Sequence, residues 1–337
     1  MKKLGFASAS ILMTAMSFNA HADIEWSGFA TVAGGIGLGD DAFVDSDITT
    51  APGVDGYYDS FEFKPGTFFA LQGSSDLGDG LSATVQIMSR GADDWDPEFT
   101  WAYLSYDVSD NFRILAGRQR MPHYMYSDYL DVSYAYHWIT PPAEVYGAPF
   151  DSIDGISAIY THDMGNSSLT FQAAFGQQKT ADTTDLDFED VIGGTLTYNY
   201  DWLTIRLANF EFDIVSTALN GSITSQDLAV QADYDGWFAI AEYSPVDLTG
   251  TGFWEVQPWM LSVGKSFDSL TPHVTYGHYK TTAVEAFFIP VDDRPYYTIG
   301  LRWDFHDSAA LKFEYSAEED STGNEAQSFQ IALTTVF

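Results

Sequence analysis

The chain has 337 residues, and its 14 Lys and Arg against 48 Asp and Glu give a net charge of −34. Such a charge repels nucleic acid and anionic lipid and favours cations nearby. The absence of cysteine excludes disulfides and thiolate metal sites. Aromatic residues make up 16% of the chain, yet its mean hydropathy is slightly negative. An apolar exterior around a polar interior would reconcile the two.

The N-terminal segment has the three parts of a secretory signal peptide. Met1-Lys2-Lys3 is basic, an apolar run extends from about Leu4 to Phe18, and Ala20-His21-Ala22 is typical of a cleavage site. Cleavage after Ala22 leaves one predicted domain, residues 23–337, with 12 basic against 48 acidic residues and a net charge of −36. Because no other segment has the roughly 18 consecutive apolar residues of a membrane helix, a membrane-embedded form would have to be a β-barrel.

Short alternating segments then predict an all-β fold. The first runs from Ile24 to about Gly35, where Phe29 breaks the alternation, and the long acidic segment from residue 37 to residue 66 is typical of an exposed loop. The clearest hairpin joins residues 67–75 to residues 81–90, and the second of these strands alternates without an error. The other predicted strands are residues 99–107, 111–119, 153–162, 168–177, 191–200, 202–211, 226–234, 237–243, 258–267, 272–280, 295–305, 309–316 and 327–337.

The connections favour a transmembrane antiparallel β-barrel over a stack of soluble sheets. Short turns alternate with longer polar or acidic loops, as periplasmic turns alternate with outer loops. The segments, about 16 in number, are each near the length of a tilted membrane strand. One inner face is ambiguous, because Phe238 and Ile240 share a side with Glu242. Aromatic residues flank nearly every short turn and predict a girdle at one membrane interface: Tyr106, Phe112, Tyr198, Tyr200, Trp202, Tyr234, Trp237, Phe267, Phe305 and Phe337.

The segment from Arg118 to Phe150 interrupts this pattern. It contains four prolines and many Tyr residues, and it keeps neither a helical nor an alternating period. A structureless run of this length inside a compact domain is usually functional. We therefore predict a constriction loop that folds into the barrel and narrows it.

The last strand ends on Phe337 after Phe329, Ile331 and Leu333 alternate with polar residues, which resembles the C-terminal signature of outer-membrane barrels. With the signal peptide, the strand number and the long loop after the fifth strand, the mature chain resembles a Gram-negative general porin. The resemblance implies a homotrimer in the outer membrane, in contact with lipid and lipopolysaccharide, that passes small hydrophilic solutes passively. The Pro-Glu-Phe-Gly-Gly run of the best-known enteric porins is absent, so we expect a constriction of different detailed shape.

Most basic residues fall at inward strand positions or at the root of the loop. In general porins a basic cluster on the wall faces acidic residues on the loop, and the resemblance implies such a field here, with excess acid favouring cations. The alternative is local pairing with Glu98, Asp107, Glu242 and Glu314. The residues expected to line the pore or its constriction are Arg90, Arg113, Arg118, Arg120, Asp128, Asp131, Glu144, Asp154, Arg206, Arg302 and Lys312.

Three other functions are alternatives to general diffusion. A substrate-specific porin could use the loop's aromatic residues as a slide for sugars, an adhesin could use its outer loops, and a barrel hydrolase would need histidines near Ser or Asp. Because no Ser or Asp stands in a recognisable relation to His123, His137 or His162, we predict no catalytic residues and no enzyme activity. The slide would consist of Tyr124, Tyr126, Tyr129, Tyr134, Tyr136 and Trp138.

We predict no cofactor and no metal. The acidic residues of the first long loop offer carboxylate oxygens for Ca²⁺, but they lack the regular spacing of a calcium loop and favour a solvated charge run. These residues are Asp40, Asp41, Asp45, Asp47, Asp55 and Asp59.

Overall fold

The structure is a computed structural model that describes residues 23–38, 57, 60–147, 149–179, 186–217, 220–282, 292–319 and 325–337. The predicted signal peptide and the six aspartates of the first long loop lie outside these residues. Within the described ranges no helix is both long and apolar enough to cross a membrane.

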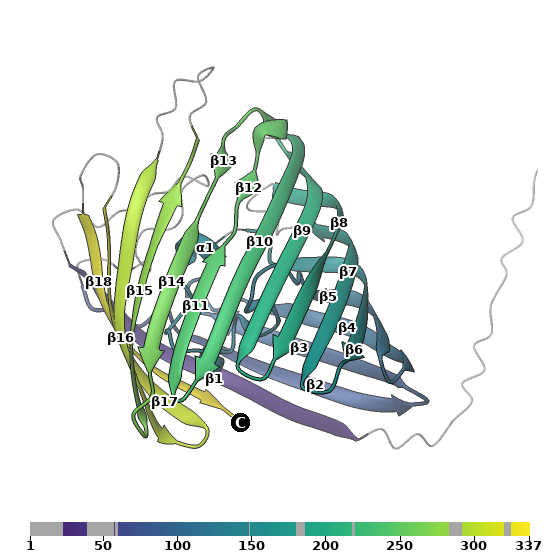
Figure 1. Cartoon of the computed structure of the whole chain (residues 1–337), viewed down its shortest axis with the longest axis horizontal. Coiled ribbons are helices and arrows are strands. Elements are labelled where there is room, and N and C mark those ends of the chain that lie inside the picture. The colour runs from purple at the N-terminus through teal and green to yellow at the C-terminus, as the bar shows by residue number, and fades with distance from the viewer. Residues whose placement is uncertain are drawn as a thin grey trace, which may run out of the picture.

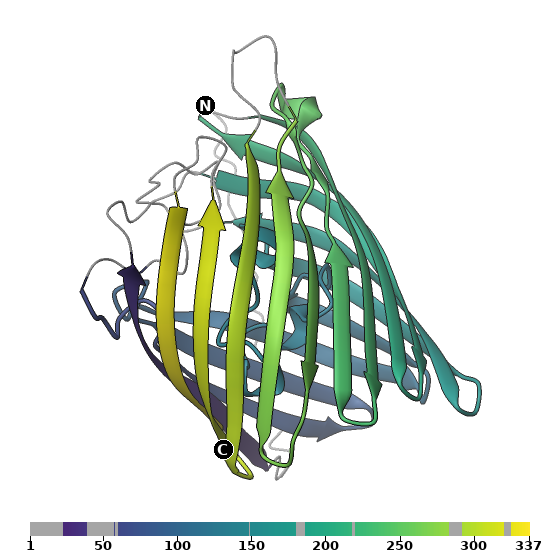
Figure 2. The same ribbon diagram turned by 60° about the vertical axis from the view of Figure 1, so that its left-hand side comes forward.

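The strands form one closed antiparallel barrel of 16 strands, which confirms the predicted fold (Figure 1 and Figure 2). Closure comes from β1, which pairs with β2 on one side and with β18 on the other. The strand elements are β1 (Ile24–Leu38), β2 (Phe68–Gly78), β3 (Leu81–Arg90), β4 (Pro97–Ser109), β5 (Phe112–Arg120), β6 (Ser152–Asp163), β7 (Ser167–Lys179), β8 (Leu186–Tyr200), β9 (Leu203–Ser216), β10 (Asn220–Tyr234), β11 (Trp237–Tyr243), β12 (Val246–Asp247), β13 (Glu255–Val256), β14 (Trp259–Lys265), β15 (Leu270–Lys280), β16 (Asp293–His306), β17 (Ala309–Glu319) and β18 (Glu325–Val336).

Two prolines explain why 18 elements make 16 wall strands. Pro245 separates β11 from β12, and Pro258 separates β13 from β14. Because proline has no N–H to give to the ladder, the regular pairing stops at each and resumes beyond it. Strand β10 bridges the first break, since it pairs with both β11 and β12.

The two faces of the wall differ in chemistry. In β3, Val85 and Ile87 are exposed on the outside, whereas Thr84 and Gln86 are buried inside. The inward Gln86 accepts a hydrogen bond from Thr100 (2.7 Å) and donates one to a neighbouring glutamine (3.0 Å). An apolar exterior over a polar interior is the arrangement that a lipid environment requires.

The closing seam depends on the absence of a side chain at Gly28. The backbone of Gly28 exchanges two hydrogen bonds with Phe337, of 2.8 and 2.9 Å. A Cβ atom at Gly28 would lie 2.5 Å from the ring of Phe337 and 2.8 Å from the carbonyl oxygen of Ala70. The Phe337 ring itself stacks on Phe69, with ring centroids 5.9 Å apart. The terminal aromatic residue thus joins the last strand to the first two.

The short turns place acidic residues in left-handed backbone conformations. Asp235 and Gly236, which join β10 to β11, have φ angles of 51° and 75°. Two consecutive positive φ angles match the twist of the flanking strands in a two-residue hairpin. Asp79, Asp201 and Asp268 have positive φ angles at other short turns, so these turns remain tight at one end of the barrel.

Between β5 and β6 the chain leaves the wall and crosses the interior. In the described part of this segment the helical elements are short: η2 (Ser127–Tyr129), η3 (Ser133–Ala135) and α1 (Ala143–Tyr146). Figure 2 shows this segment inside the barrel, behind the strands of the front wall. Residues 121–151 are called the constriction loop below.

Candidate functional site

The constriction loop packs against one side of the barrel interior through an apolar cluster. Its rings lie on Phe238, Ile240, Met260 and Tyr296 of the wall, and His137 stacks on Phe238 with ring centroids 3.7 Å apart. The ambiguous face of β11 is thereby resolved, because Phe238 and Ile240 point inward and the loop covers them. The loop residues in this cluster are Tyr124, Met125, Tyr126, Tyr136, Trp138, Val145 and Tyr146.

Three basic side chains of the wall bind loop carbonyl groups. Lys312 on β17 is fully buried, and its Nζ donates to the carbonyls of Ser133, Tyr136 (2.9 Å) and Trp138. Arg302 on β16 donates from Nη1 to the carbonyls of Tyr134 (2.7 Å) and Tyr136 (2.8 Å). An ammonium or guanidinium group offers several donors to one region, so these residues hold an irregular backbone whose carbonyls would otherwise be unsatisfied.

A third wall cation repeats this arrangement at the root of the loop. Arg206 on β9 donates from Nη2 to the carbonyl of Pro122 at 2.8 Å. The wall also supplies acceptors, because Glu242 accepts from the backbone N–H of Met125 at 3.0 Å and from the hydroxyl of Tyr146. Farther along, Glu314 accepts from the backbone N–H of Ile139 at 2.9 Å. Donors and acceptors of the wall therefore form hydrogen bonds with the loop backbone at several points.

Two walls of the interior can now be distinguished. The covered wall comprises the inner faces of β9–β11 and β14–β17, which hold the loop. The open wall comprises the short-turn halves of the inner faces of β4–β7, where Arg113 is exposed and Tyr103 and Gln172 are half-buried. Toward the loop end of these strands, Met121 and Phe150 cover Ile153 and Ala174. The inner face of the open wall therefore keeps side chains in contact with solvent.

The predicted meeting of a loop acid with wall bases occurs at one place. Asp131 of the loop pairs with Arg90 on β3 (3.0 Å) and with Arg120 at the end of β5. Arg90 also pairs with Glu98, and Arg120 with Asp151. These groups neutralise one another in direct contact. This cluster therefore does not provide an electric field between separated charges.

Local pairing, the alternative to a transverse field, accounts for only part of the wall. Arg90 pairs with Glu98, and Arg113 pairs with Asp107 through Nε at 2.5 Å. Arg206 and Lys312 instead bind loop carbonyls. The position of Arg113 at the short-turn end of β5 also separates it from the constriction.

The prediction that Arg118 and Asp154 line the pore is wrong. They lie opposite each other on β5 and β6 and form a bidentate pair with two bonds of 2.7 Å. Register places them on the face that carries Val85 and Ile156, which are 42% and 55% exposed on the outside of the barrel. The sequence places these charges beside the loop, but strand parity directs them outward.

Two other predicted residues lie on the loop itself. Asp128, in η2, is exposed. Glu144, in α1, is half-buried and lines a small cavity together with Tyr296 and Glu314.

The histidines of the loop are structural. His123 is fully buried, and its Nε2 lies 3.0 Å from the hydroxyl of Ser225 and 3.3 Å from that of Ser244. Burial, and secondarily the nearby Arg206, lowers the pKa of His123 to about 3. Burial, and secondarily His273, also lowers the pKa of His137 to about 3. Both rings are therefore neutral at ordinary pH, and no solvent reaches the His123–Ser225 contact.

An aromatic slide for sugars is contradicted by the burial of its rings. Tyr124, Tyr126, Tyr136 and Trp138 are 1–4% exposed. Tyr129 alone among the six has a large exposed fraction, 37%. The aromatic residues serve instead as the core between loop and wall.

Sequence reasoning singled out the cations Arg206, Arg302 and Lys312 but not their role as anchors, and it missed the acceptors and hydroxyl groups of the wall that also hold the loop. The sequence pattern suggests Glu242 and Glu314 only as partners of wall cations, and it does not single out Ser225 or Thr275. Thr275 accepts from the indole N–H of Trp138 at 2.8 Å. The usable signal was Glu242 itself, an acid on the same face as two large apolar residues. No group of three or more His, Asp or Glu residues in the described part of the chain is arranged to hold a metal ion.

Comparison with known proteins gives a consistent result. A family model described as Gram-negative porin matches residues 7–334. Among solved structures, OmpF of Salmonella typhi in complex with daunomycin has a TM-score of 0.69 at 13% identity, covering 95% of this chain and 99% of that one. The outer membrane channel DcaP of Acinetobacter baumannii has a TM-score of 0.62 at 14% identity, with the same coverage. The trimer form of OmpT, an outer membrane protein of Vibrio cholerae, has a TM-score of 0.62 at 12% identity, covering 94% and 99%. A comparison with curated proteins found no match.

Proposed function

The chain belongs to the Gram-negative porin family and forms an outer-membrane channel, and we propose that this channel passes small hydrophilic solutes and ions by passive diffusion, with a preference for cations. The observation that supports the proposal is the constriction loop, which lies inside the barrel and packs on the covered wall rather than on the open wall. Arg113, Tyr103 and Gln172 on that wall keep contact with solvent. A barrel filled by its own loop would offer no such surface.

The cation preference is supported by the pairing and burial of the basic groups. Arg90 and Arg120 are neutralised by direct pairing with acids, and Lys312 is buried beneath the loop. The exposed Asp128 makes no ion pair with any residue that the structure describes, so its charge is free to act on the passage. Rings of unneutralised carboxylates select cations, and the net charge of −34 acts in the same direction.

We further propose export with cleavage after Ala22 and assembly as a homotrimer in contact with outer-membrane lipid and lipopolysaccharide. The trimer form described for OmpT of Vibrio cholerae supports the assembly. The outward pair Arg118–Asp154 supports it independently. Arg118 is six residues from Phe112 along β5, which is roughly 14 Å across the membrane for a strand of normal rise and tilt. Charges at this depth within an apolar band about 25 Å tall are better covered by protein than by lipid.

The assembly has its own test. Arg118→Glu would repel Asp154 on the outer face, and Arg113→Glu would repel Asp107 on the inner face to a similar degree. We expect Arg118→Glu to convert the trimer to monomers in analytical ultracentrifugation and Arg113→Glu to leave the trimer intact. Equal behaviour of the two variants would remove Arg118–Asp154 from the contact surface.

The channel itself is tested by single-channel recording of the refolded protein in a planar bilayer, with the reversal potential taken under a KCl gradient. We expect conductance in steps of three and a cation-selective reversal potential. An ohmic, unblocked conductance in the presence of sugars would agree with general diffusion. Absence of conductance from well-folded protein would contradict the proposed function. We propose no enzyme activity, since the His123–Ser225 contact is sealed from substrate.

A further inference from the structure

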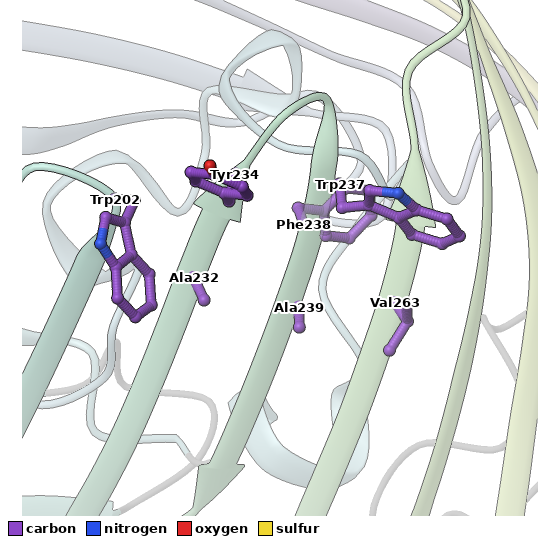
Figure 3. A pocket seen from close by; sticks show the side chains of 7 residues that line it. All are labelled: Trp202, Ala232, Tyr234, Trp237, Phe238, Ala239 and Val263. Carbon is purple, nitrogen blue, oxygen red and sulfur yellow. The ribbon is translucent and has the colours of Figure 1, made fainter.

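A groove on the outer surface of the barrel is lined by small residues and rimmed by rings. It has a volume of about 490 Å³ and lies across β10, β11 and β14 at the short-turn end, beside Trp202 in the turn before β9. Figure 3 shows Trp202, Tyr234 and Trp237 around Ala232 and Ala239. Outer-membrane barrels direct their short turns to the periplasm, so the groove lies at the depth of the periplasmic leaflet.

The groove exists because one tier of the outer face lacks large side chains. Ala232 and Ala239 are directly opposite each other, and Ala239 is opposite Val263. The next tier toward the turn pairs Tyr234 with Trp237, whose rings are 71% and 51% exposed. A shallow floor below a raised aromatic rim leaves room for an extended apolar chain rather than for a compact solute.

A cation stands at the rim of this groove. Lys265 is directly opposite Trp237 in the register, and its Nζ lies 4.7 Å from the centre of that ring and 5.6 Å from the centre of the Phe267 ring. It makes no ion pair with any residue that the structure describes. In a chain whose other cations are almost all paired with acids or bound to carbonyls, this ammonium group is available to an external anion.

The same rim also carries acidic groups. Asp235 follows Tyr234 in its turn, and Asp268 follows Phe267 in the next turn, and both are exposed. A ligand with phosphate alone would meet repulsion from these carboxylates, whereas one with a phosphate and an ammonium group would match both signs. The charge pattern therefore favours a zwitterionic head group over a purely anionic one.

We propose that this groove binds one phospholipid of the periplasmic leaflet, with an acyl chain over Ala232 and Ala239 and the head-group phosphate at Lys265. The occupant is a glycerophospholipid with a phosphoethanolamine head. Aromatic side chains at a membrane interface provide an apolar surface for the chain and a polar edge near the head group. The site depends on the barrel lying in the membrane, and its test is independent of conductance.

The test is native mass spectrometry of the folded protein titrated with dioleoyl phosphatidylethanolamine. We expect one tightly held lipid per protomer. Ala232→Leu combined with Ala239→Leu fills the floor, and loss of contact with two or more methylene groups should weaken binding about tenfold. The matched control is Ala158→Leu with Ala173→Leu, a cross-strand alanine pair on the outer face of β6 and β7, which should bind as the unchanged protein does.

The head-group contact has a separate readout. Lys265→Gln should weaken phosphatidylethanolamine about threefold, as expected for an exposed ion pair, and should not change binding of dioleoylglycerol, which has the same chains and no phosphate. Lys179→Gln, at the end of β7 and away from the groove, should leave the binding of both lipids unchanged. If the filled variant fails to show the heat-modifiable mobility of a folded barrel, Lys265→Gln decides the question.

Three results would overturn the proposal. The first is equal lipid retention by the filled variant and the unchanged protein. The second is equal loss in the control pair, which would indicate general lipid adhesion to the barrel. The third is binding of lipid A as tight as that of phosphatidylethanolamine, which would assign the groove to a different class of lipid.

Discussion

The covered wall and the open wall of the barrel use the same residue types for different purposes. On the covered wall Lys312 is fully buried and binds carbonyl groups of the constriction loop. On the open wall Arg113 is exposed and pairs with Asp107 on the adjacent strand. An inward basic residue in a barrel is therefore an anchor where a third element lies over it and a solvated ion pair where none does. Strand parity alone does not distinguish the two.

The largest difference between the walls should appear on removing one cation from each. Lys312→Met leaves the loop carbonyls of Ser133 and Trp138 without their donor in a buried place, whereas the carbonyl of Tyr136 keeps its bond from Arg302. We expect a loss of about 3–5 kcal/mol in unfolding free energy. Because η3 and the following residues would detach from β17, single-channel conductance should become noisy and, on average, larger.

The open-wall counterpart is Arg113→Met. It removes an exposed ion pair, and we expect a stability change of less than about 1 kcal/mol with steady conductance. Both quantities come from urea unfolding in detergent and from planar-bilayer recording. A similar response of the two variants would mean that the covered wall does not depend on its buried cation.

Acid should loosen the covered wall and leave the open wall unaffected. The pKa of His123 in the folded protein is about 3, against an ordinary value of 6.5. The unfolded chain therefore binds the proton first as pH falls. The resulting stability is fully present above about pH 6.5 and is lost progressively toward pH 3. At pH 5 the loss for His123 should be about 2 kcal/mol.

The contribution of His123 is isolated by comparing slopes. His123→Gln should flatten the fall in unfolding free energy between pH 7 and pH 5, whereas His162→Gln, at an exposed position near the end of β6, should not. Carboxylates titrate in both variants and cancel in the comparison. Identical slopes in all three proteins would show that His123 is not the acid-sensitive group.

Much of the fold was predictable from sequence because lipid imposes period two on every strand. The predicted segment 81–90 coincides with β3, and β11 is the predicted 237–243. Most other strands extend a few residues farther into the loops, where solvent on both sides removes the apolar alternation. Phe29 broke the pattern for a physical reason, since it points inward and contacts Phe68, with ring centroids 6.3 Å apart.

The site was less predictable because its partners are far apart in sequence. The loop was identified by its prolines and rings, but the direction of those rings depends on which wall receives them. Tyr126, for instance, bonds to Gln231 at 3.1 Å, more than a hundred residues away. The predicted inward position of Arg118 and Asp154 was wrong for a local reason. A shift of one residue along β5 moves a side chain from the inner face to the outer face.

A smaller effect is expected from single hydrogen bonds between loop and wall. Tyr146→Phe removes the hydroxyl that donates to buried Glu242, and we expect a loss of about 1–2 kcal/mol because the carboxylate stays desolvated. On the open wall, Tyr103→Phe should cost less than about 0.5 kcal/mol, since the side chain is half-buried and its hydroxyl can be solvated by water. Thermal unfolding in detergent would measure both. A larger loss at Tyr103 would reverse the assignment of the two walls.

The smallest effect concerns Asp128, the exposed acid of the loop, which should change selectivity without changing stability. Asp128→Asn removes one charge in contact with solvent. At high dielectric and physiological salt this is expected to lower the cation-to-anion permeability ratio about twofold, with unfolding free energy unchanged within about 0.5 kcal/mol. Asp110→Asn, in the turn between β4 and β5, removes an equally exposed charge at the short-turn mouth. If the reversal potential shifts for Asp128 and not for Asp110, the constriction loop sets the selectivity. Equal shifts would assign selectivity to the summed charge of the barrel.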